Sequence, residues 1–140
     1  MSFVHLHTHS EYSWLDGACT IDDLVQRAVQ YKMPAVAITD RNSVAGASRL
    51  WHQCVKAGIK PIIGLEAYLA THSMQDRDPK LDKNAMHLLL LAENNTGYKN
   101  LLKIASTAQL EGFYYYPRID HEYLAEHSEG LIATTGCMAV

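Results

Sequence analysis

The chain has 140 residues, of which 48% are hydrophobic and 19% are charged, and this composition is ordinary for a soluble globular domain with a real core. Its formal net charge of −3 excludes the overall basic character of a protein that binds nucleic acid unaided. Three cysteines, Cys19, Cys54 and Cys137, lack metal-finger spacing, and the N-terminus lacks the features of a secretion signal. We therefore expect a cytoplasmic protein, and its longest apolar runs are too short to cross a membrane.

The first expected strand, at residues 3–7, opens a run of histidines at alternate positions. Because side chains alternate between the two faces of a strand, His5, His7 and His9 are expected on one side. At about 3.3 Å per residue, His7 and His9 lie about 6.7 Å apart along the backbone, close enough for both rings to reach one metal ion. A single histidine in a strand is usually an ordinary surface or core residue, but this repeat and the following Asp16-Gly17 turn favour a metal site.

Helix and strand patterns alternate along the rest of the chain. Thr20-Ile21-Asp22-Asp23 resembles a capping box that starts a helix ending near residue 31. The later patterns predict a strand at 35–39, a helix at 44–57 closed by Gly58, strands at 60–70 and 87–92, a helix at 96–110 closed by Gly112, a short helix at 120–127 and a strand at 131–135. Residues 71–84 form a polar loop, and residues 113–116 form a short aromatic stretch that Pro117 interrupts.

This alternation predicts an α/β fold with a mostly parallel sheet, either open or closed into a barrel. The glycine-rich phosphate motif of the open class is absent. His7, His9, Asp40, Glu66 and the segment 134–137 lie at or just after the ends of expected strands, where barrel enzymes place their sites. Because a closed α/β barrel usually needs about 200 to 250 residues, we expect residues 1–140 to form an incomplete barrel.

Several side chains of this sequence can ligate a metal ion, and their mixture of nitrogen, oxygen and sulfur donors suits Zn, Mn or Fe. The candidates are His7, His9, Asp16, Glu66, His87 and Cys137. Glu66 ends an apolar run, and a carboxylate is costly to bury there unless it is paired or coordinating. His87 begins its strand, so only an antiparallel pairing with the Glu66 strand would bring it to the same site, within about 8 Å of Glu66.

The longer motifs resemble a known family. HLHTHSEYSWLDG, AITDRN, PIIGLEAYLA, HLLLLAENNTGYKNLLKIAS, LEGFYYYPRID and SEGLIATTGC are similar to the polymerase and histidinol phosphatase (PHP) domain at the N-terminus of bacterial DNA polymerase III alpha subunits. The first motif alone indicates only the PHP superfamily, which includes phosphoesterases. The later segments indicate the polymerase branch.

The resemblance implies a distorted seven-stranded α/β barrel with up to three divalent metal ions. By position, the implied ligands are His7, His9, Asp16, Glu66, His87 and Cys137, with His5 and Asp40 in the surrounding shell. It also implies that an Asp-x-His ligand motif and the polymerase modules lie downstream of residue 140. The implied partners are DNA and other replicase subunits, among them a proofreading exonuclease subunit.

One departure from the family pattern concerns metal binding directly. The metal-binding members have histidine where this chain has Arg41, and a guanidinium that stays protonated cannot ligate a metal ion. One reading is a partly degenerate site in a domain that serves as a scaffold or docks the proofreading subunit. The other is a metal-dependent phosphoesterase, a 3′–5′ exonuclease acting on DNA ends, in which Arg41 contacts phosphate and metal ions about 3.5 to 4 Å apart act together.

Three further expectations follow from the sequence. A free-standing phosphatase for a small molecule would explain the metal motif but not LEGFYYYPRID. Tyr114, Tyr115 and Tyr116 could stack on bases, although aromatic residues beside Pro117 and Arg118 more often form a packed corner. An uncovered strand edge would allow the chain to associate with a second copy.

Overall fold

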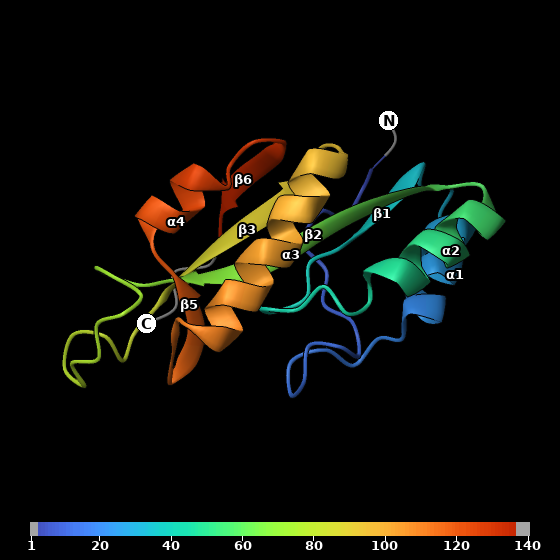
Figure 1. The fold of residues 1–140 in the computed structure, drawn as a ribbon. Coiled ribbons are helices and arrows are strands. Elements are labelled where there is room, and N and C mark those ends of the chain that lie inside the picture. Colours follow the sequence, from blue (N-terminus) through green and yellow to red (C-terminus); the bar gives the residue numbers. More distant parts are fainter. Residues whose placement is uncertain (1–2, 137–140) are drawn as a thin grey trace.

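The computed structural model describes residues 3–136, in which helices and strands form a mixed α/β fold (Figure 1). The elements are α1 Ile21–Gln30, β1 Ala35–Ile38, α2 Ala47–Ala57, β2 Lys60–Leu69, β3 Met86–Ala92, α3 Asn95–Leu110, β4 Phe113–Tyr114, β5 Tyr116–Ile119, α4 His121–Glu126 and β6 Leu131–Thr135. This confirms the predicted α/β class. In the described part of the chain, no helix is long and apolar enough to span a membrane.

Strand β2 is the centre of the sheet. It pairs in parallel with β1 and β5 and antiparallel with β3, whose other edge pairs antiparallel with β6. The predicted antiparallel pairing of His87 with the Glu66 strand is confirmed, because Tyr68 lies opposite His87 in the β2–β3 register. The expectation of a mostly parallel sheet was wrong. A loop joins β2 to β3 in place of a crossover helix, so β3 returns alongside β2 in the opposite direction.

Two apolar clusters form the core, one on each half of β2. Helix α3 packs over β2, β3 and β5 through residues that include Leu65, Leu90 and Ile104. Helices α1 and α2 pack beside β1 through residues that include Ile21 and Leu50. Figure 1 shows α3 lying along the sheet and α1 and α2 together at its other end. The carboxyl half of β2, which carries Glu66, is buried.

The N-terminal segment is not a regular strand, although the sequence predicted one over residues 3–7. It runs beside β1, where the carbonyls of His5 and Thr8 accept hydrogen bonds from Ala37 N–H and Thr39 N–H at 3.2 and 2.8 Å. The amide of Thr8 donates to the hydroxyl oxygen of Thr39 at 2.8 Å, so a side chain takes the place of a backbone acceptor. The use of a side-chain acceptor at this point breaks the ladder of backbone hydrogen bonds that defines a strand.

The aromatic stretch forms a tight hairpin of β4 and β5. The sequence suggested that Pro117 interrupts this stretch. Pro117 instead lies within β5, opposite Phe113. Tyr115 makes the turn with φ of 57°, a left-handed conformation that is uncommon for a residue with a side chain. The hairpin therefore directs the neighbouring tyrosines, Tyr114 and Tyr116, into different surroundings.

Arg118 on β5 organises the polar loop at residues 71–84, and it is fully buried. Its guanidinium donates to the backbone carbonyls of Met74, Asp76, Asp82 and Gly112 at 2.9 to 3.3 Å. Its guanidinium carbon also lies 5.3 Å from the centre of the Tyr114 ring, a distance typical of a cation–π contact. The Gly112 carbonyl also accepts a hydrogen bond from the backbone N–H of Arg118. One buried cation thus pairs with the three loop carbonyls of Met74, Asp76 and Asp82.

Replacing Arg118 with leucine should leave these carbonyls unpaired and lower the free energy of unfolding by about 3 kcal/mol, as measured by urea denaturation. Trypsin should also cleave the loop faster at Lys80 and Lys83. Arg77→Leu is the matched control, because Arg77 lies in the same loop with an exposed side chain. Equal urea midpoints for the two variants would contradict a stabilising role for Arg118.

Candidate metal centre

The centre is built around the carboxylate of Glu66, which is 1% exposed in the middle of the sheet. His7 Nε2 lies 3.0 Å from Glu66 Oε2, and His9 Nε2 contacts the same oxygen. His87 Nδ1 lies 2.6 Å from the other oxygen, Oε1. Three imidazoles from two distant parts of the sequence therefore surround one carboxylate.

The charge of Glu66 follows from these contacts. Burial by itself raises the pKa of Glu66, but hydrogen bonds from His9 and His7 and the nearby charge of Arg41 outweigh it and lower the pKa to about 2. Glu66 is therefore an anion at neutral pH. An anionic oxygen beside imidazole nitrogens is a suitable environment for a divalent cation.

Tyr68 is part of this centre, although the sequence analysis did not single it out. It lies two residues after Glu66 on β2 and therefore on the same face of the strand. Its ring contacts the His87 ring edge-on at a centroid distance of 4.6 Å. Its hydroxyl oxygen accepts a hydrogen bond from Arg41 at 3.3 Å. The period of two along a buried strand was the signal that could have identified it.

Asp40 fixes the loop that follows His9. Its buried carboxylate accepts hydrogen bonds from Ser10 N–H at 2.6 Å, Ser10 O–H at 2.8 Å and Ser13 O–H at 2.7 Å. The loop then turns at Gly17, where an added Cβ would lie 1.9 Å from the Ser10 carbonyl oxygen, so only glycine fits. Asp40 thereby sets the position of His9 and the return of the chain past Asp16.

Arg41 lies between the two carboxylates that the sequence analysis named as ligands. Its guanidinium is 3.3 Å from Asp16 Oδ2 and 3.9 Å from Glu66 Oε1. Burial lowers the pKa of Arg41, but its hydrogen bond to Tyr68 and the charges of Tyr68, Glu66 and Asp16 raise it overall, so the group stays protonated. A permanent cation thus occupies the space between Asp16 and Glu66.

The donor set of His7, His9 and Glu66 fits a metal ion. One nitrogen or oxygen from each of these residues lies within 4.8 Å of the others. Donors on one Zn²⁺ ion, each at about 2.0 to 2.2 Å, lie no more than about 4.4 Å apart, so small side-chain shifts complete the fit. Among the described residues, this is the one group of histidine, cysteine and acidic side chains so arranged.

The remaining predicted site residues have different placements. His5 is exposed, and its ring packs edge-on against Phe3 at a centroid distance of 4.8 Å. It is not a member of the group formed by His7, His9 and Glu66. Cys137 lies outside the described residues. It directly follows Gly136, whose N–H donates to the His87 carbonyl at 3.3 Å.

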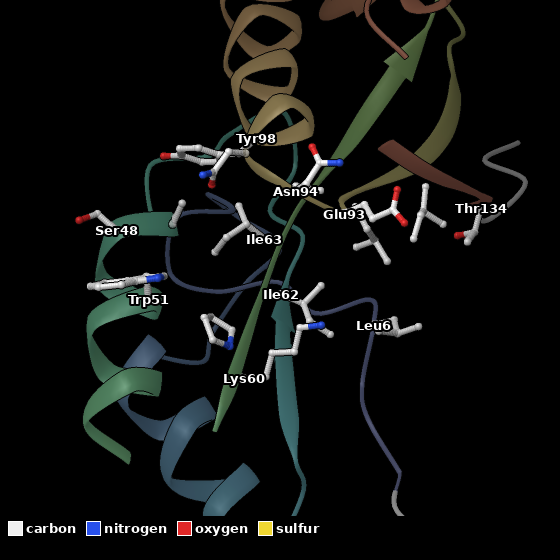
Figure 2. Close-up of a pocket in the computed structure, with 16 residues that line it drawn as sticks. Leu6, Ser48, Trp51, Lys60, Ile62, Ile63, Glu93, Asn94, Tyr98 and Thr134 are labelled. Atoms are coloured by element: carbon white, nitrogen blue, oxygen red, sulfur yellow. The ribbon is translucent and has the colours of Figure 1, made fainter. Parts of the chain in front are cut away.

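A separate cavity of about 640 Å³ lies at the other end of β2. Figure 2 shows Trp51 and Tyr98 on one side of it, Leu6 on the other, and Ile62 between them. Apolar side chains make up much of its lining. None of its lining residues belongs to the His7, His9 and Glu66 group.

Comparison with known proteins agrees with this geometry. Residues 5–139 match the family model of the PHP domain. The chain belongs to the PHP domain family. It is 50% identical over 137 residues to DNA polymerase III subunit alpha of Borreliella burgdorferi, and 46% identical over 142 residues to that of Aquifex aeolicus. These matches cover 97% of this PHP chain but 12% of each relative, and they confirm the resemblance drawn from the motifs.

Solved structures share the PHP fold. An amidohydrolase from Chromobacterium violaceum aligns with a TM-score of 0.56 and 21% identity, over 76% of this chain and 33% of that protein. A protein from Bifidobacterium adolescentis described as a metal-dependent phosphoesterase aligns with a TM-score of 0.55 and 20% identity, over 76% of this chain and 32% of that protein. At these identities the likeness concerns the fold.

Replacing Asp40 with alanine should leave three buried donors without their acceptor and lower the free energy of unfolding by about 3 kcal/mol in urea denaturation. Ser13→Ala is the graded comparison, because it removes one of the three donors together with the acceptor of the Arg41 N–H, and should cost about 2 kcal/mol. If both variants unfolded at the wild-type urea concentration, Asp40 would not be the residue that fixes the loop.

Proposed function

We propose that this chain acts as the N-terminal PHP domain of a replicative DNA polymerase III alpha subunit in the cytoplasm, where it is a scaffold around a partly degenerate metal centre. The observation that carries this proposal is the meeting of His7 and His9 with Glu66. An ion bound there would tie the N-terminal segment to the central strand. The similarity to alpha subunits along nearly the whole chain supports the replicative role.

The centre is proposed to hold one divalent ion, of Zn, Mn or Fe, rather than the three that the family allows. His7, His9 and Glu66 are its principal ligands, and His87 and Cys137 complete it. A metal ion would have to compete with Arg41 for the carboxylate of Asp16, because the guanidinium lies 3.3 Å from Asp16 Oδ2. Arg41 supplies one fixed positive charge beside Glu66 and thereby lowers the demand for further cations.

We also propose that further strands of the barrel, downstream of residue 140, pack against β6 and the cavity beside β2. Ile132 on β6 is 50% exposed, and both Ile132 and Thr134 line the cavity. The chain spans about an eighth of the length of the curated relatives. The polymerase activity and the docking of a proofreading subunit are therefore proposed for a whole alpha subunit and not for this part of it.

Elemental analysis of chelator-free protein tests the metal centre. We expect about one equivalent of a transition metal per chain, and a loss of most of it in the His7→Ala, His9→Ala double variant. His52→Ala is the matched control, because His52 lies on α2 and bonds to the Ser48 carbonyl. Chelation should lower the melting temperature of the wild type and leave that of the double variant unchanged. Less than about 0.2 equivalents in the wild type would contradict the centre.

A second function, hydrolysis of the 3′ end of DNA, is favoured by one observation. The His7 side chain is 43% exposed, so solvent and substrate can reach the centre. A divalent ion, when bound, would polarise a phosphate and lower the pKa of a water molecule. The chain itself supplies His7, His9 and Glu66 to hold that ion, and Arg41 to receive phosphate oxygens on its planar guanidinium.

A nuclease assay separates the two functions. The scaffold predicts that residues 1–140, and a longer chain that includes the downstream Asp-x-His motif, release nucleotides from 3′-labelled single-stranded DNA no faster than their Glu66→Gln variants. The assay uses added Mn²⁺ or Zn²⁺. A rate more than about tenfold above Glu66→Gln, reduced again by Arg41→Ala, would instead establish the hydrolytic function.

A further inference from the structure

A stack of aromatic rings leads from the metal centre to the protein surface. The His87 ring, which contacts Glu66, meets the edge of the Tyr68 ring at a centroid distance of 4.6 Å. The Tyr68 ring in turn lies 4.8 Å from the Tyr116 ring, with 33° between their planes. This contact is tilted, with an angle between those of edge-on and offset-stacked rings. The stack therefore begins at the buried carboxylate and ends at Tyr116.

The two ends of the stack differ in exposure. The His87 side chain is 6% exposed and Tyr68 between them is 7% exposed, whereas Tyr116 is 44% exposed. The β4–β5 hairpin creates this difference, because its turn at Tyr115 sends Tyr114 over Arg118 and Tyr116 onto Tyr68. The expectation of a packed corner therefore describes Tyr114. Tyr116 instead extends an aromatic stack outward.

A cation lies beside the same stack. The guanidinium carbon of Arg41 is 6.0 Å from the centre of the Tyr68 ring, and Arg41 also donates to the Tyr68 hydroxyl at 3.3 Å. Tyr68 thus contacts both Tyr116 and Arg41, so a base on Tyr116 and a phosphate on Arg41 would each lie beside a neighbour of the same buried ring.

We propose that Tyr116 is a stacking platform for a base at the 3′ end of single-stranded DNA, and that Arg41 contacts the phosphate of that end. The proposal rests on the second proposed function, hydrolysis of the 3′ end of DNA, since it requires DNA to reach the PHP domain. The proposal specifies which part of the DNA is recognised, namely the base and the phosphate at the 3′ end. Tyr116 binds a base through its ring face, so recognition tolerates any base.

Single-stranded DNA fits this surface better than duplex DNA does. A duplex is bound chiefly through many phosphate contacts by basic surfaces, and this chain has a net charge of −3. An exposed aromatic residue that is joined through Tyr68 to one cation suits an unpaired end, whose last bases are free to leave the stack of the duplex. The site therefore selects frayed or unpaired 3′ ends.

Photocrosslinking in the full-length protein tests the platform. The probe is an oligonucleotide with an unpaired 3′ end that carries 5-iododeoxyuridine at its last position. We expect a crosslink at Tyr116, located by mass spectrometry of the tryptic peptide that ends at Arg118. Tyr116→Leu should reduce the crosslink yield about tenfold or more, and Tyr116→Phe should preserve binding of the unpaired end, because the ring rather than the hydroxyl makes the contact.

Tyr115→Leu is the matched control. Tyr115 lies on the same hairpin with 52% exposure, but its ring packs against Tyr114. An equal loss of crosslink in the Tyr115 and Tyr116 leucine variants, or no crosslink in the wild type, would overturn the platform. Metal content measured on the same samples separates the two proposals. A crosslink in metal-free protein would contradict the metal centre alone, and bound metal without a crosslink would contradict the platform alone.

Discussion

The interaction on which the rest of the structure depends is the contact of the Glu66 carboxylate with three imidazoles. A carboxylate that is almost fully buried is strongly unfavourable unless it is paired, and here every pairing partner comes from elsewhere in the chain. His7 and His9 reach it from the N-terminal segment, and His87 reaches it from β3. Stabilising the charge of Glu66 therefore requires that the N-terminal segment and β3 assemble around β2. As a result, the side chains of His7, His9 and His87 converge on one carboxylate.

Arg41 determines how much positive charge this site can still accept. Two carboxylates, Asp16 and Glu66, face a guanidinium that cannot lose its proton. One cation against two anions leaves a deficit that a single divalent ion more than covers, whereas three such ions would gather far more positive charge than the donors offset. In the proposed centre, arginine at the position where the family resemblance implies a histidine ligand therefore changes the expected number of ions. It also places a group that can bind phosphate beside His7, His9 and Glu66.

The sequence predicted those features of the site that depend on short-range patterns. The capping role of Thr20, the closure of α2 by Gly58 and the antiparallel return of His87 to the Glu66 strand followed from spacing and from the cost of burying a charge. The N-terminal strand was predicted wrongly because Thr39 offers its hydroxyl in place of a backbone partner, which no local pattern reveals. The role of Arg118 was also inaccessible, since it depends on carbonyls of a loop about 40 residues away in sequence.

Strand β2 joins two regions of different polarity. Its carboxyl half is paired with β3 and carries the charged centre, whereas its amino half pairs with β1 and borders the apolar cavity. Strand β6 and the residue after it contribute to both regions, because Ile132 lines the cavity and Gly136 donates to the His87 carbonyl. Any segment that covers β6 therefore also restrains His87, which contacts the carboxylate at the centre. Completion of the barrel and strength of metal binding are thus expected to be thermodynamically linked, since each stabilises the arrangement that the other requires.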